Sequence, residues 1–454
     1  MVDKLSDGRF AVDGPRGTFF GVPRSGIKFI SNFLAGKFWR YFLETVVVCA
    51  LTLGTTSGEA AEKRSTSAPR LEISTSRPED PCQKELITFL KSPNYSSAHL
   101  KLVDSLRHKM APSPRVSRET MRLWANNPHG EKEELSRRFR SIVGKILMDA
   151  GIKGEEKSVN SGQKIVHRKK LTDYEELMDA AGRIVASGDL SLRCFPAKAF
   201  AGLEKHSNGG KPHVTVVNGL PAESLQHFPS SNGKPPIVQV ASRFNGLESA
   251  RAETVDSLPE WTKDNAQGPG IALTALAGAA ERYVAYLQGT LPDAIEPLLR
   301  ECRIGGVSIL DLYPCPEPEA YQWDLEQARA QGLHKNGHFR PWVIGNIQHL
   351  RILREHIATG AGDLGILCQW VRCEESGTDQ LQVFSSAASF AQQEVDWRVR
   401  SPKIAAHKNL CEILLVTQYR ALGQLAAATG MDLHLTAVGI GAFKNPSEIL
   451  GKAL

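Results

Sequence analysis

From about Leu190 onward, short apolar runs alternate with longer segments of helical periodicity. The runs are rich in Val, Ile and Leu and are bounded by Gly, Pro and Asn, as strands buried on both faces are. The five strand candidates are residues 213–217, 235–241, 364–371, 380–385 and 433–438. Strands that alternate with helices predict an α/β fold, in which a sheet lies between two layers of helices. Ligands in such folds bind at the C-terminal ends of the strands.

The helical periodicity predicts three long helices between these strands. The first is rich in small residues, which would let it pack closely on a sheet. They are expected at residues 271–287, 347–357 and 404–428.

Three regions are expected along the chain. Residues 190–454 form the α/β module, and residues 81–189 a helical region with a further helix at 174–186. Residues 1–80 are an extension, rich in Gly, Pro, Ser and basic residues at first. With 454 residues, the chain is long enough for more than one unit.

The extension contains an apolar run at residues 41–53, which is short for a membrane span. Its length suits a signal-peptide core, but Glu44 lies inside it and the preceding segment is long for a signal. Residues 29–42 place aromatic residues between lysines, a pattern typical of interfacial helices. Membrane association through residues 29–53 and a poorly ordered extension both remain open interpretations.

Composition narrows the choice of compartment and partner. The eight cysteines are scattered and none shows Cys-x-x-Cys spacing, so free thiols and a cytoplasmic location are the default expectation. The cysteine count alone does not exclude secretion, and the compartment stays open. The net charge of +6 is modest, and the basic cluster at residues 167–170 is interpreted as a solvated loop. Nucleic acid is therefore not the expected partner. His334 and His338 lie four residues apart, but no third ligand has a fitting spacing, so no metal site is predicted.

A glycine turn follows the last strand candidate. Gly439 and Gly441 are separated by Ile440 and lead through Ala442 and Phe443 to a helix that is expected after Asn445. A strand, a glycine-rich turn and a helix start can bring backbone N–H groups together around a phosphate. Taken alone, the glycine pair is more often an ordinary tight turn.

Two further loops carry unusual motifs at expected strand ends. One is Gln239-Val-Ala-Ser-Arg-Phe-Asn-Gly-Leu-Glu248, and the other is Asp264-Asn-Ala-Gln-Gly-Pro-Gly-Ile-Ala272. Together with Leu435-Thr-Ala-Val-Gly-Ile-Gly-Ala-Phe-Lys-Asn445 and Gln382-Val-Phe-Ser-Ser-Ala387, they resemble the macrodomain superfamily. The resemblance is to its divergent branch near the poly(ADP-ribose) glycohydrolases and bacterial effector ADP-ribosylhydrolases. It covers residues 190–454 and implies a three-layer α/β/α mixed sheet.

The resemblance also implies a ligand, ADP-ribose, alone or attached to a protein. The expected ligand-binding residues are Asn245, Gln267, Gly268, Gly439, Ile440, Gly441, Ala442 and Phe443. The last loop would hold the diphosphate, whereas Asn245 and Phe443 would approach the distal ribose. Each has a structural alternative: Asn245 as a turn cap, Gln267 and Gly268 as a helix cap, and Phe443 as a core aromatic.

Asp264 and Glu248 are the expected catalytic residues. Cleavage at an anomeric carbon needs a carboxylate that activates water or stabilises positive charge. Asp264 is the first candidate for that role and Glu248 the second. The structural alternatives are a turn-capping aspartate and a solvated or arginine-paired glutamate.

The predicted function is that of an ADP-ribosylhydrolase, which needs no redox cofactor. The alternative is a non-catalytic reader of ADP-ribose, and the last loop favours it because Ile440 and Lys444 replace glycines of the branch. A dehydrogenase or methyltransferase is disfavoured, because no strand is followed by Gly-x-Gly-x-x-Gly and a later acid.

Overall fold

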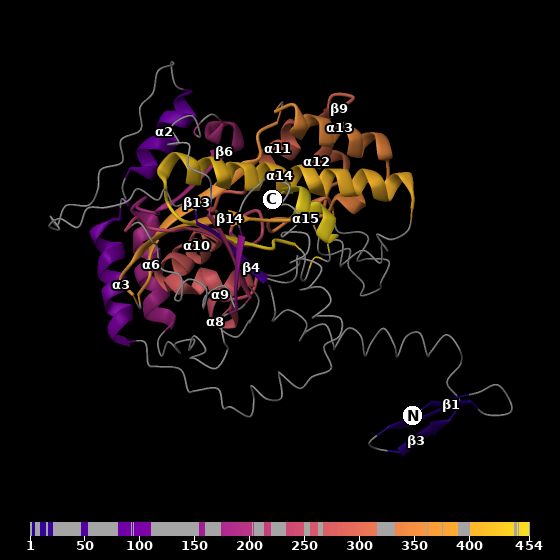
Figure 1. Cartoon of the computed structure of the whole chain (residues 1–454), viewed down its shortest axis with the longest axis horizontal. Helices are drawn as coiled ribbons and strands as arrows, with labels where there is room; N and C mark the ends of the chain where they lie inside the picture. The colour runs from indigo at the N-terminus through magenta and orange to yellow at the C-terminus, as the bar shows by residue number, and fades with distance from the viewer. Residues whose placement is uncertain are drawn as a thin grey trace. The chain divides into compact units, whose positions relative to one another are not determined.

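The computed structural model describes the fold of most of the α/β region (Figure 1). The described residues are 2–4, 10–14, 17–20, 47–52, 80–91, 93, 95–109, 154–158, 174–201, 203, 213–218, 233–248, 255–261, 267–315, 332–360, 362–374, 376–388, 400–439, 443 and 445–453. Contacts divide the chain into two units, Met1–Glu44 and Thr45–Leu454.

The first unit contains a three-stranded antiparallel sheet. Its strands are β1 (Val2–Lys4), β2 (Phe10–Gly14) and β3 (Gly17–Phe20).

The second unit is built on an eight-stranded sheet in the order β5-β7-β4-β15-β8-β14-β13-β6. Neighbouring strands are parallel at β15–β8, β8–β14 and β5–β7 and antiparallel elsewhere, so the sheet is mixed. The strands are β4 (Val47–Thr52), β5 (Gly154–Ser158), β6 (Leu192–Pro196), β7 (His213–Asn218), β8 (Ile237–Ala241), β13 (Gly365–Arg372), β14 (Asp379–Ser385) and β15 (Leu433–Thr436). This result confirms the α/β class and the five expected strands.

Helices lie on both sides of the sheet, with α14 on one side and α6 and α10 on the other (Figure 1). The longer helices are α2 (Pro81–Leu90), α3 (Ser97–Lys109), α6 (Tyr174–Ala186), α10 (Leu276–Leu287), α13 (Ile347–Ala358) and α14 (Pro402–Thr429). The shorter ones are α8 (Leu258–Trp261), α9 (Gln267–Ala272), α11 (Glu296–Glu301), α12 (Ile309–Leu312), α15 (Ser447–Ala453) and the 3-10 turns η2 (Ala197–Phe200), η4 (Leu273–Ala275) and η7 (Pro341–Val343). Two small hairpins complete the described elements: β9 (Arg303–Ile304) with β10 (Val307–Ser308), and β11 (His334–Lys335) with β12 (His338–Phe339).

The buried apolar residues form two hydrophobic clusters, and the larger one includes residues from both faces of the strands. The larger contains Trp370, whose indole N–H donates to the Phe89 carbonyl oxygen on α2, and residues of α13 and α14. The smaller joins α3, α6, α8 and α10. On the side of the sheet that carries α6 and α10, α10 packs on β13 at Gly278, where a Cβ would lie 2.6 Å from a methyl carbon of Val371. The absence of a side chain at Gly278 therefore sets how closely α10 approaches the sheet.

The long helix expected at residues 271–287 is interrupted. α9 ends at Ala272, η4 follows, and α10 begins only after Ala275, whose backbone is not helical (φ −133°, ψ 82°). The buried carboxylate of Glu374 explains the restart, because it accepts hydrogen bonds from the N–H groups of Leu276 and Ala277 (3.1 and 2.8 Å). A continuous apolar pattern cannot reveal a cap that is contributed by a residue so distant in sequence.

Helices of the region expected at 81–189 pack on elements of the region expected at 190–454. α6 packs on α10, and α2 packs beside β6 and η2. The apolar run at residues 41–53, considered above as a targeting or interfacial segment, contains β4, which pairs with β15 and β7. None of the described helices combines the length and apolar character needed to cross a bilayer. Residues 29–42 and the helical faces expected at residues 110–150 lie outside the described part of the chain.

Candidate functional site

Three adjacent parallel strands, β15, β8 and β14, end at the same edge of the sheet. Gln239 on β8 joins them through its fully buried amide. Its Oε1 accepts from the Thr436 N–H of β15 (2.9 Å), and its Nε2 donates to the Ser385 hydroxyl of β14 (3.0 Å). The loops that follow these strands are therefore held side by side, and they carry three of the four quoted motifs.

The loop after β8 contains Asn245, which is buried. Its Oδ1 accepts a hydrogen bond from the Leu247 N–H (3.2 Å), and Gly246 has a positive φ of 72°. These features are those of a turn stabilised by its asparagine. Asn245 thus has the turn-capping contact considered as its structural alternative, and it lies at the strand edge where the resemblance places a ligand.

Glu248 ends the same loop and is also buried. A Cβ on Gly268 would lie 2.3 Å from its Oε2 and 1.9 Å from the Ala241 carbonyl oxygen. The start of α9 therefore lies directly against both Glu248 and the end of β8. Only glycine fits at position 268.

Arg282 of α10 provides the opposite charge near Glu248. Its guanidinium is fully buried, donates from Nε to the Gly246 carbonyl oxygen (3.1 Å) and bonds to Gln369 of β13. Burial lowers the pKa of Arg282 to about 10, against the raising effect of Glu248 and Glu281. Glu248 is accordingly a buried carboxylate that interacts electrostatically with an arginine. This environment resembles the arginine-paired glutamate that was considered as its structural alternative.

The loop after β15 is closed at its base. Gly439 adopts a φ of +82°, and its carbonyl oxygen accepts from both the backbone N–H and the Nδ2 of Asn445 (3.0 and 3.1 Å). Asn445 Nδ2 also donates to the Ala388 carbonyl oxygen beyond β14 (3.0 Å). Asn445 was not among the predicted site residues, although it ends the quoted motif, and it ties the loops after β15 and β14 together.

Helix α14 holds the loops after β15 and β14 through two of its side chains. The Tyr419 hydroxyl donates to the Thr436 carbonyl oxygen and accepts from the Val438 N–H (3.3 Å). The amide of Gln418 accepts from the Ser386 N–H and donates to the Ser386 carbonyl oxygen, both at 2.8 Å. A rigid helix therefore fixes the backbone on which the candidate site is built.

The β11–β12 hairpin is a part of this edge that the sequence analysis did not assign. The Phe244 N–H donates to the Gly337 carbonyl oxygen (2.9 Å), and the Arg243 guanidinium donates to the Asn336 carbonyl oxygen (3.0 Å). His338 is buried, and its ring lies 5.9 Å from that of the half-buried Phe443. The Asn336-Gly337 pair is the available sequence signal, since this dipeptide is typical of tight hairpins.

Several predicted residues fall outside the described residues. Among them are the first catalytic candidate and three residues of the last loop: Asp264, Ile440, Gly441 and Ala442. Gln267 is described only as the first residue of α9, without its side chain.

Glu374 follows β13 and is a further buried carboxylate. The pairing of Arg372 with Asp379 places it beyond the start of β14, at the opposite end of the sheet from Ser385. Burial raises the pKa of Glu374 to about 7, although two backbone N–H groups of α10 act in the other direction. Its position and contacts assign it to capping α10.

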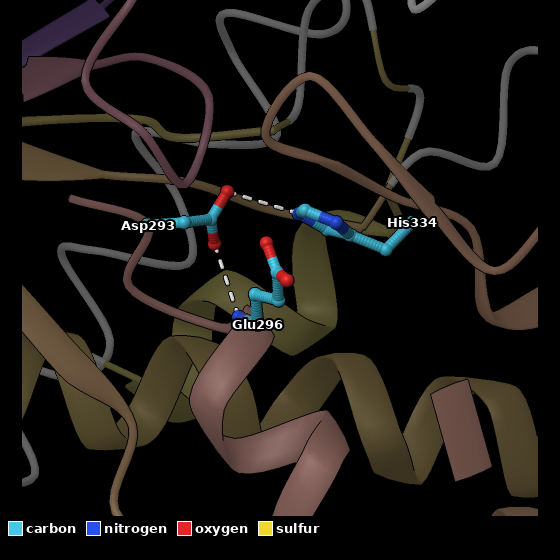
Figure 2. A group of neighbouring side chains, drawn as sticks. All are labelled: Asp293, Glu296 and His334. Atoms are coloured by element: carbon cyan, nitrogen blue, oxygen red, sulfur yellow. Dashed lines mark hydrogen bonds and ion pairs between the residues drawn. The ribbon is translucent and has the colours of Figure 1, made fainter. Parts of the chain in front are cut away.

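A separate group of possible metal ligands contains Asp293, Glu296 and His334 (Figure 2). One ligand atom from each lies within 4.8 Å of the others. Burial raises the pKa of Asp293, but bonds from His334 and from the N–H groups of Ile295 and Glu296 outweigh it and lower the pKa. Sequence spacing pairs His334 with His338 instead, because Asp293 and Glu296 lie far from His334 in sequence.

No protein-family model matches the chain, and comparisons with curated proteins and with solved structures found no match either.

Proposed function

We propose that the chain binds ADP-ribose at the edge formed by β15, β8 and β14 and removes it from modified proteins. One observation carries the proposal. The motif loops, which are distant in sequence, are joined at the C-terminal ends of adjacent parallel strands by Gln239, Asn445 and the backbone at Gly268. Nucleotide-like ligands bind at such edges in α/β proteins.

In the proposed complex, the backbone of residues 439–442 holds the diphosphate through its N–H groups. Phe443 and Asn245 face the distal ribose, and His338 supports Phe443 from the β11–β12 hairpin. This arrangement needs a glycine loop with a fixed base, and the two hydrogen bonds to the Gly439 carbonyl oxygen supply that base.

Asp264 is the proposed water-activating group at the ribose C1″ position. Glycosidic cleavage passes through a positively charged sugar, so a carboxylate both stabilises the charge and accepts the proton of the attacking water. The burial of Glu248 beneath Gly268 and its proximity to Arg282 favour a positioning role, in which it supports the start of α9.

The second candidate is a reader that binds ADP-ribose without turnover. The same burial of Glu248 favours it, because a carboxylate held against the backbone is poorly placed to act as a base. Ile440 favours it as well, since its Cβ lies in a loop where the resemblance expects glycine.

Two measurements test these proposals. Calorimetric titration with ADP-ribose should show binding by the wild-type chain and by Asp264→Asn. Release of ADP-ribose from a modified protein should occur with the wild type and be lost in Asp264→Asn. Binding without release by the wild type leaves the reader function, and the absence of binding rejects both proposals.

A further inference from the structure

Asp293, Glu296 and His334 come from two pieces of backbone that are distant in sequence, and their side chains point toward one another (Figure 2). Asp293 follows α10, Glu296 is the first residue of α11, and His334 begins the β11–β12 hairpin. The exposed fraction of the side chain increases from 8% for His334 to 15% for Asp293 and 35% for Glu296. The group is thus held by the fold and open to solvent on one side.

Asp293 is already fixed in the orientation that a ligand needs. Its Oδ1 accepts from the N–H groups of Ile295 and Glu296, both at 3.0 Å, which leaves Oδ2 directed at His334. Glu296 uses one oxygen, Oε1, for Arg300 (2.6 Å from Nη2), so its other oxygen can serve a second partner. Figure 2 shows the Glu296 carboxylate between Asp293 and His334, with no interaction drawn to either.

The distance between Asp293 Oδ2 and His334 Nε2 is 3.0 Å. Zinc binds imidazole nitrogen and carboxylate oxygen at roughly 2.0–2.2 Å, so two ligands of one tetrahedral ion lie roughly 3.4 Å apart. The hydrogen bond that now joins the two atoms is therefore shorter than the separation of two zinc ligands by only a few tenths of an ångström. A cation would replace the shared proton with little movement of either side chain.

We propose that Asp293, Glu296 and His334 form a binding site for a divalent transition-metal ion, with zinc as the best-matched ion. An imidazole with two carboxylates suits zinc and its neighbours, whereas magnesium and calcium prefer oxygen ligands alone. Three protein ligands leave further coordination positions for water. The proposal does not rest on ADP-ribose binding.

The ion would fasten the β11–β12 hairpin to the segment between α10 and α11. That segment is already joined to the loop after β8, because the Ala294 N–H donates to the Phe244 carbonyl oxygen (2.9 Å). The Phe244 N–H in turn donates to Gly337 at the hairpin turn (2.9 Å). A bound ion would thus stabilise the hairpin that lies against Phe244 and Phe443.

The test uses the full chain without an affinity tag, freed of metal by a chelator and titrated calorimetrically with zinc chloride. We expect one zinc ion per chain and a melting temperature that rises with zinc concentration. Glu296→Gln and His334→Gln should each weaken binding by at least tenfold, because loss of outer-shell partners alone costs roughly 10–100-fold. Magnesium chloride should not reproduce the rise.

Two controls separate this site from other zinc-binding groups on the chain. Glu301→Gln makes the same change on the same helix at an exposed position outside the group and should bind like the wild type. The site is rejected by an absence of zinc binding, or by equal binding in all three variants. Titration with cobalt(II) adds a spectroscopic check, since a thiolate charge-transfer band would assign binding to cysteine and overturn the proposed ligand set.

Discussion

Asn445 donates two hydrogen bonds to the carbonyl oxygen of Gly439, one from its backbone N–H (3.0 Å) and one from its side-chain Nδ2 (3.1 Å). These bonds close the loop that follows β15, and a third bond, to Ala388, anchors the closed loop beside β14. The shape of the proposed diphosphate site therefore depends on a residue at the end of the loop, which was not among the expected ligand-binding residues.

Replacement of Asn445 by alanine should abolish detectable ADP-ribose binding and lower the free energy of unfolding by about 1–3 kcal/mol, because the side chain loses two buried bonds. Asn346→Ala is the control. It removes the N-cap of α13 at a similar cost of about 1 kcal/mol, and it lies away from the edge. Calorimetric titration and urea unfolding measure both effects. Equal loss of binding in the two variants would indicate a general effect of stability.

Gly439→Ala should destabilise the chain by about 2–4 kcal/mol. The positive φ disfavours any Cβ, and here it would lie 2.5 Å from the Ala387 Cβ. The matched change Gly423→Ala within α14 meets nothing within 4 Å and should stabilise the helix by about 0.5–1 kcal/mol. Urea denaturation compares the two, and a neutral Gly439→Ala would show that this loop is not held in the described conformation.

Arg282→Met should cost about 3–5 kcal/mol of unfolding free energy, because it leaves the buried carboxylate of Glu248 without the nearby guanidinium. The double variant Arg282→Met/Glu248→Gln should recover part of that loss, since it removes the charge as well. Arg354→Met, which breaks an exposed pair with Glu355, should cost less than about 1 kcal/mol. A double-mutant cycle without coupling would contradict the interaction of Arg282 with Glu248.

The unfolding free energy should depend on pH through Glu374. Its pKa is about 7 in the folded chain against an ordinary 4.5, so the folded state binds more protons between these values. Stability should therefore fall as the pH rises from 4.5 to 7 and change no further above that range. Relative to Glu374→Gln, the wild type should lose about 3 kcal/mol over this interval. Parallel pH profiles of the two proteins, measured by chemical denaturation, would refute this assignment.

The local pattern of apolar residues was sufficient to predict many of the helices and strands. α6 was predicted to the residue, and the five strand candidates all became strands, because burial on both faces leaves a continuous apolar run. The apolar run at residues 41–53 was harder to interpret. Its length fits a signal-peptide core as well as a strand, and only its pairing with β15 and β7 distinguishes them.

The features that the sequence did not predict depend on contacts between segments that are distant in the chain. Glu374 accepts bonds from α10 and Glu248 lies near Arg282 of the same helix, and a carboxylate in a sequence gives no sign of such a partner. His334 was compared with its neighbour in sequence, His338, whereas the fold brings it to Asp293 and Glu296. Asn445 was visible in the motif, but its role as the closure of the loop required the position of Gly439.

The contact between Gly278 and β13 has a consequence for how such a chain can evolve. A Cβ there would lie 2.6 Å from Val371, and the sheet on that side carries the buried Gln369 that Arg282 contacts. A larger residue would push α10 outward and separate Arg282 from its acceptors. Position 278 should therefore admit only glycine in any descendant that retains this polar core.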